Sequence, residues 1–195
     1  MTEKQVERIN TKIKRIRGAL AAEKRRFGAY DDSRGLRYMP AALFIQIGDY
    51  RGAMTYMRWF QKNFEDDMGF PDFLFEWTLI LFKNKKLKDA ERKAFETFCS
   101  NTYFFDKFFG KPIVPVAKYE SSNVDKPEFT QYLTYSSKNP DLSDFSNWLN
   151  HTVNEEKFKA ASTKFVDVQK RLLVEDDLET RGYLDKFLRQ LRDNY

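Results

Sequence analysis

Residues 48–60, GDYRGAMTYMRWF, narrow the choice of fold more than any other stretch of this chain. Glycine adopts backbone conformations that end a helix, so the Gly-Asp pair at the start predicts a break between two helices. Behind the break, four residues spaced by three, one and three positions fall on one face of a second helix: Ala53, Tyr56, Met57 and Phe60. Two antiparallel helices approach closely only where one side chain is small, and Ala53 provides that gap. The stretch therefore predicts a helical hairpin.

The chain repeats this pattern at an offset of 37 residues, which pairs Ala53 with Ala90. Each half then reads as a helix, a short polar turn and a second helix. In the second half Lys85 stands where the first half has its turn glycine. We therefore predict two consecutive hairpins within residues 34–110, the second less regular than the first.

The first half, LRYMPAALFIQIGDYRGAMTYMRWFQKNFEDD, resembles a tetratricopeptide repeat. Its Gly-Asp-Tyr matches the inter-helix turn of that family, Ala53 the small crossing position, and Met57 the large apolar position of the second helix. The likeness covers residues 34–105. It implies an all-α fold of antiparallel helical hairpins in a right-handed stack, extended by further N- and C-terminal helices.

In this family the first helix of each pair lines a concave surface that usually holds a peptide. The positions that would line this groove here are mostly apolar: Tyr38, Ala42, Ile45, Gln46, Phe75, Leu79, Phe82 and Lys83. An exposed apolar groove of that size favours aggregation, so something must cover it. Either a partner segment fills the groove or the chain's own C-terminal helices do, and we favour the second.

Residues 1–29 predict a basic amphipathic helix. Its apolar positions form one stripe: Val6, Ile9, Ile13, Ile16 and Leu20. Nine Lys and Arg stand against three Glu, a local charge of +6 that leaves about −1 for the rest of the chain. The candidate basic surface comprises Lys12, Arg15, Arg25 and Arg26. We expect the stripe to pack on the repeats, with contact to nucleic acid, contact to a membrane surface and self-association as the alternatives.

The rest of the chain predicts a connector and more helices. Residues 111–125 hold two prolines and a Ser-Ser pair, and read as an ordered connector. Residues 126–195 should pack on the same domain as helices at 127–137, 141–151, 154–174 and 177–193. The one strand-like segment is IVPV at 113–116.

Composition argues against most catalytic classes. The chain has one cysteine, Cys99, and one histidine, His151, too few for a cysteine-rich zinc site or a disulfide framework. Cys99 lies in an aromatic helical stretch where a thiol behaves as a small hydrophobe, and His151 reads as a residue near a helix C-terminus. No phosphate-binding or dinucleotide motif occurs. We expect no enzyme activity, no cofactor and no metal.

These observations predict a non-enzymatic scaffold or adaptor that binds a protein or peptide partner by the apolar groove or the basic helix. A nucleic-acid-associated protein using the Lys/Arg-rich helix is the alternative. The sequence has no signal-peptide pattern and no apolar run long enough to span a bilayer, so we expect a cytoplasmic protein without a membrane partner. A homo-oligomer formed through the N-terminal helix is a further alternative.

Overall fold

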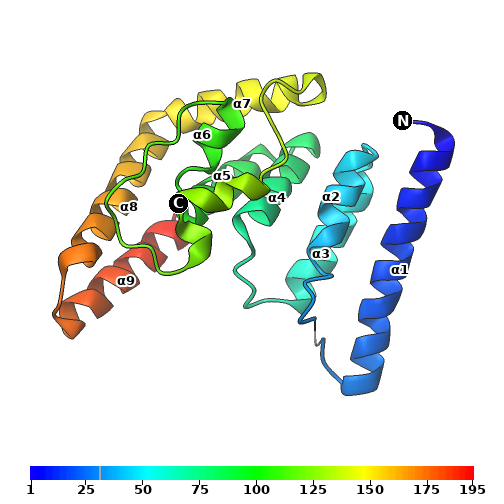
Figure 1. The fold of residues 1–195 in the computed structure, drawn as a ribbon, viewed down its shortest axis with the longest axis horizontal. Coiled ribbons are helices and arrows are strands. Elements are labelled where there is room, and N and C mark those ends of the chain that lie inside the picture. The colour runs from blue at the N-terminus through cyan, green and yellow to red at the C-terminus, as the bar shows by residue number, and fades with distance from the viewer. Residues whose placement is uncertain (31) are drawn as a thin grey trace.

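A computed structural model describes residues 1–30 and 32–195, and in these residues the chain is all-α, without a strand (Figure 1). The helices, in chain order, are α1 (Glu3–Phe27), α2 (Met39–Gln46), α3 (Tyr50–Asn63), α4 (Pro71–Lys83), α5 (Leu87–Ser100), α6 (Phe104–Phe109), α7 (Ser143–Asn154), α8 (Glu156–Val174) and α9 (Leu178–Asp193). Short 3₁₀ turns η1 (Asn123–Asp125), η2 (Pro127–Tyr132) and η3 (Pro140–Leu142) precede α7. None of the described helices is both long enough and apolar enough to cross a membrane.

Helix α1 has well-formed ends. Thr2 and Gln5 form a capping box at its start, and Gly28 ends it in the left-handed conformation, with φ of 76°. Ile13, Ile16 and Leu20 are buried, as the apolar stripe predicted, against the neighbouring α2–α3 hairpin. Figure 1 shows α1 in blue as the outermost helix at one end of the molecule.

The predicted first hairpin is formed by α2 and α3. Asp49 caps α3 by accepting a hydrogen bond from the Gly52 backbone N–H at 2.8 Å. Ala53 is fully buried, as expected for a helix-crossing position. The tightest approach, however, is at Gly52, where an added Cβ would lie 2.8 Å from the Phe44 ring and 2.2 Å from the Asp49 carboxylate. Both small residues are therefore needed for α2 and α3 to pack.

The two hairpins turn in the same way. Gly48 and Lys85, 37 residues apart, both have the left-handed backbone conformation, with φ of 71° and 61°. In each turn this residue donates its N–H to the carbonyl three positions before it, and the next residue donates to the carbonyl five positions before it. Lys85 is the one non-glycine residue in the described chain with positive φ. The sequence offset thus corresponds to a repeated turn, and the chain contains packed helix pairs.

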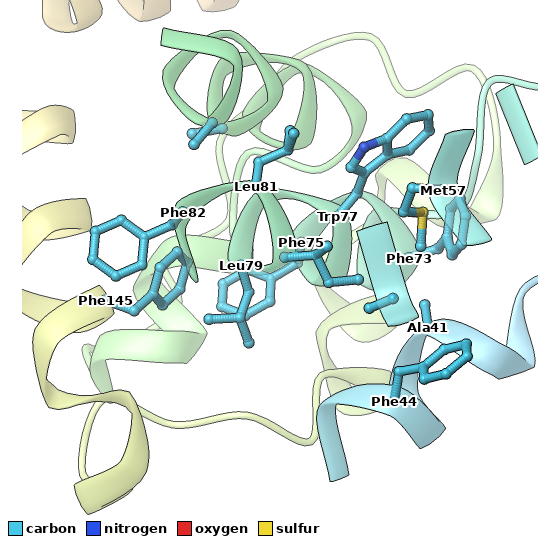
Figure 2. Close-up of a cluster of buried hydrophobic side chains, with 14 of the residues drawn as sticks. Ala41, Phe44, Met57, Phe73, Phe75, Trp77, Leu79, Leu81, Phe82 and Phe145 are labelled. Atoms are coloured by element: carbon cyan, nitrogen blue, oxygen red, sulfur yellow. The ribbon is translucent and has the colours of Figure 1, made fainter. Parts of the chain in front are cut away.

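Helix α4 is the centre of the core. Phe73 to Phe82 are all buried, so the helix has no solvent face, and its neighbours α2, α3, α5 and α7 surround it. Figure 2 shows Phe73, Trp77, Phe75 and Phe82 extending from α4 in different directions. Ala90 and Ala94 of α5 are fully buried and let α5 lie close against it.

Helix α5 ends at Asn101, whose amide donates to the Val124 and Lys126 carbonyls at 2.6 and 2.9 Å and so holds the end of the connector. Two predictions for the second half were wrong in detail. The helix expected at 127–137 is the 3₁₀ turn η2 followed by extended chain. The IVPV segment is not a strand. Helices α7, α8 and α9 lie within two or three residues of their predicted bounds.

Candidate functional site: a basic helix with a furrow on its flank

The groove predicted from the family likeness is covered along α4 by the chain itself. Phe75 is fully buried, with the Tyr135 ring stacked at 5.7 Å and the Phe145 ring edge-on at 5.6 Å. The centroid of the Phe82 ring lies 5.5 Å from that of Phe145 (Figure 2) and 5.0 Å from that of Trp148. The covering segment is therefore residues 135–148 and not the last helix. Phe75 is not accessible to a partner in this arrangement.

The polar residues of that predicted groove are also engaged, except one. Lys83 donates to the Asp144 carboxylate at 2.7 Å and to the Asp141 carbonyl at 3.0 Å, which ties α4 to the start of α7. Although desolvation raises the pKa of Asp144, the Lys83 hydrogen bond and charge outweigh it and hold that pKa below its usual range. Gln46 is exposed at the end of α2.

Tyr38 belongs to a network that joins two loops. Its hydroxyl donates to Asp67 at 2.7 Å, and Arg37 binds Asp67 at 2.6 Å and Asp32 at 3.3 Å. Desolvation raises the pKa of Asp67, but hydrogen bonds from Tyr38, the Gly69 backbone and Arg37 outweigh it and lower that pKa. Burial and the Asp67 carboxylate raise the pKa of Tyr38. The network fixes the loops on either side of the first hairpin, which is a structural role.

The basic residues of α1 remain open to solvent. All nine Lys and Arg side chains of α1 belong to exposed residues, including Lys12, Arg15, Arg25 and Arg26. Within residues 1–30 and 32–195, none of the nine lies within salt-bridge distance of a carboxylate. The helix is 25 residues long, or about 37 Å. It is therefore a long basic face at the end of the molecule.

Helix α3 extends this positive region. It carries Arg51, Arg58 and Lys62, all exposed, and no acidic residue. Residues 1–63 hold fourteen Lys and Arg against six Asp and Glu, a charge of +8, while residues 64–195 sum to −3. The charge separates along the molecule, which favours oriented approach of a charged partner.

A furrow runs between α1 and α3 along the flank of the basic face. Its volume is about 370 Å³, and its lining is Lys14, Arg17, Gly18, Ala21, Tyr30 and Trp59. Tyr30 meets Trp59 edge-on at 5.6 Å, and the Lys24 ammonium lies 4.7 Å above the Tyr30 ring. Lys24 also donates to Asn63 of α3 at 3.2 Å. We call these six lining residues the furrow: an aromatic and small-residue floor with a basic rim.

A cavity of about 600 Å³ lies between α4, α5, α9 and the connector. Its charged side chains are largely paired: Lys93 is bonded to Glu96 and lies 4.2 Å over the Trp77 ring. Cys99 lines it, and burial raises the pKa of the Cys99 thiol. His151 is elsewhere, exposed on α7 and 2.9 Å from Glu155. In the described chain, no three His, Cys, Asp or Glu side chains come together as metal ligands would.

One buried acid was missed from the sequence. Glu76 lies inside the apolar α4 run, where its carboxylate accepts a hydrogen bond from the Tyr135 hydroxyl at 2.9 Å. Burial raises the pKa of Glu76 to about 8. The signal was a single acid within PDFLFEWTLILF. Glu76 therefore helps to hold residues 135–148 on α4, and it does not line an open site.

The comparisons with known proteins add no family to these observations. No family model matches the chain, and neither the curated proteins nor the solved structures contain a match.

Proposed function

We propose that this protein is a non-enzymatic scaffold or adaptor that binds an acidic partner segment on the basic face of α1. The observation that carries the proposal is the exposure of all nine Lys and Arg residues of α1 with no carboxylate partner among the described residues. Unpaired charge along one helix attracts a partner of opposite sign and speeds encounter. The apolar groove contributes less, because residues 135–148 cover its α4 part.

We further infer that α2 to α5 are two tetratricopeptide-like hairpins in a right-handed stack. The 37-residue offset, the matching turns at Gly48 and Lys85 and the buried Ala53 and Ala90 support this inference. Helical hairpins of this kind serve as frames for partner binding. A single cysteine is in keeping with a reducing compartment, and we place the protein in the cytoplasm.

Nucleic-acid binding through the same helix is the second candidate function. The furrow favours it, because the partly exposed Tyr30 and Trp59 rings beside Lys14 and Arg17 could stack on bases while the cations bind phosphates. The net charge of −3 on residues 64–195 argues the other way, since it repels phosphates beyond the N-terminal third. A short acidic protein segment can bind along α1 alone, without approaching residues 64–195.

Fluorescence anisotropy with two labelled probes separates the two functions. The probes are a glutamate-rich peptide and a DNA duplex of the same net charge, each titrated with the full-length protein at low and at physiological salt. We expect the peptide to bind more tightly and to weaken with salt. The variant Lys12→Ala, Arg15→Ala, Arg25→Ala, Arg26→Ala should lose about tenfold or more in peptide affinity.

A matched control removes four exposed lysines outside α1. These are Lys126, Lys138, Lys159 and Lys164, which make no side-chain hydrogen bond in the described residues. The control should bind the peptide within about twofold of the unchanged protein. Tighter binding of the duplex would replace the adaptor with the nucleic-acid function. Absence of binding to both probes at low salt would refute both proposals.

A further inference from the structure

The turn between α8 and α9 exposes apolar side chains. Leu173, Val174 and Leu178 are 50%, 76% and 84% exposed, an unusual solvent contact for three large aliphatic residues within six positions. Residues 173–179, LVEDDLE, also carry four carboxylates and no basic residue. We call residues 173–179 the hairpin tip.

The hairpin tip is held in one shape. Arg181 donates to the Leu172 and Glu175 carbonyls at 2.8 and 2.7 Å, and so closes the turn. Asp177 caps α9 by accepting from the Thr180 N–H at 2.8 Å. A rigid protrusion loses less conformational entropy on docking than a mobile loop does. The three exposed aliphatic side chains are therefore presented in a fixed arrangement.

The furrow is complementary to the hairpin tip both in its apolar floor and in its charge. Its floor of Gly18, Ala21, Tyr30 and Trp59 can receive an aliphatic side chain, because the Gly18 position has no heavy atom within 4 Å of an added Cβ. Its rim is basic, whereas the hairpin tip is acidic. An apolar contact surrounded by opposite charges is the usual arrangement of a specific protein interface.

We propose that the hairpin tip of one molecule docks in the furrow of a second copy of this chain, with Leu178 or Val174 on the furrow floor and the Asp176 and Glu179 carboxylates against Lys14 and Arg17. The proposal rests on the proposed function of α1 as a binder of acidic segments, and it names the segment. The acidic partner is then the protein itself.

The position of the two surfaces makes the contact intermolecular. In Figure 1, α1 lies at one end of the long axis and the α8–α9 turn, in orange, at the other. A molecule with a rigid hairpin tip and furrow so placed cannot close on itself. Joining unlike surfaces head to tail leaves one of each free, so the assembly grows into a ring or an open chain.

Sedimentation velocity of the full-length protein tests the association. We expect the weight-average mass to rise with protein concentration between about 1 µM and 1 mM, the range for a contact smaller than about 1,200 Å². The rise should shrink at high salt, because the rim charges are exposed. A constant monomer mass over this range would overturn the inference. Peptide binding by α1 would be unaffected by that outcome, so the two proposals fail separately.

Two charge-reversal variants make the test specific. The tip variant is Asp176→Lys with Glu179→Lys, two exposed residues whose side chains make no hydrogen bond in the described chain, and the furrow variant is Lys14→Glu with Arg17→Glu. Each variant alone should stay monomeric. Mixed in equal amounts they should associate again, because the acidic hairpin tip of the furrow variant fits the basic furrow of the tip variant, and the two reversed surfaces are also opposite in charge.

This mixing experiment also guards against misfolding, since a misfolded variant could not restore the association. The control variant Glu128→Lys with Asp185→Lys makes the same charge change at exposed sites away from the hairpin tip and should associate as the unchanged protein does. Leu178→Ser, which leaves the charge unchanged, should reduce association at least about threefold. Failure of the mixture to associate, or an equal loss in the control, would overturn the assignment of these two surfaces.

Discussion

Replacing Glu76 with glutamine should stabilise the folded protein by an amount that increases with pH. Glu76 is buried within α4, and burial raises its pKa from 4.5 to about 8. A glutamine keeps the shape of the side chain and its acceptor for the Tyr135 hydroxyl, but it has no charge to bury. The two proteins should therefore differ only where Glu76 of the unfolded chain is ionised.

The sign follows from proton binding. The folded state holds the Glu76 proton more tightly than the unfolded state does. The free energy of unfolding is therefore highest below pH 4.5, where Glu76 is protonated in both states, and it falls as the pH rises to about 8. One pKa unit corresponds to about 1.4 kcal/mol, so the loss is about 3 kcal/mol at pH 7 and about 4 to 5 kcal/mol above pH 8. Glu76→Gln should recover most of this free energy of unfolding.

Urea unfolding, followed by the fluorescence of the three tryptophans, measures the effect. Both proteins are unfolded at several pH values between 5 and 9, and the difference in free energy of unfolding is plotted against pH. Glu128→Gln, at an exposed residue of η2, is the matched control and should differ from the unchanged protein by less than about 0.5 kcal/mol throughout. A Glu76→Gln difference that stays constant from pH 5 to pH 8 would refute the reasoning.

Three further changes test the packing. Phe145→Ala should lower the free energy of unfolding by about 3 to 5 kcal/mol, because the ring is fully buried on α4, whereas Phe27→Ala at an exposed ring should cost little; urea unfolding compares them. Gly18→Ala should raise the melting temperature through about 1 kcal/mol of helix propensity, while Gly52→Ala should lower it by steric conflict, and equal shifts would contradict this. The Cys99 thiol, its pKa raised by burial, should react with a thiol reagent faster in urea than in buffer.

Local features of the structure could be predicted from local sequence signals. The end of α1 at Gly28, the break at Gly48 and the buried face of α3 follow from glycine conformation and from the spacing of apolar residues. Lys85 shows that the repeat could be inferred even where its glycine is replaced, because the neighbouring pattern remains. The nine exposed cations of α1 could likewise be anticipated, since they lie off the apolar stripe.

Features that depend on distant partners could not be predicted in this way. Asn101 ends α5 where the Val124 and Lys126 carbonyls, at the end of the connector, are in reach of its amide, and nothing near Asn101 in the sequence indicates them. Residues 127–137 have a helical pattern, but Pro127 to Tyr132 form a 3₁₀ turn and the chain then runs extended so that Tyr135 reaches α4. Tertiary contacts overrode local propensity at both places.

The sequence by itself determined the helical class, the first hairpin and the basic N-terminal helix, because helix caps, apolar periodicity and charge are properties of neighbouring residues. Only the tertiary structure decided which segment covers the α4 face, how Glu76 is buried and where the furrow and hairpin tip lie. These features depend on which apolar surfaces pack together, and any apolar segment of suitable shape could cover the surface of α4. The choice of residues 135–148 therefore became visible only when the whole chain was packed.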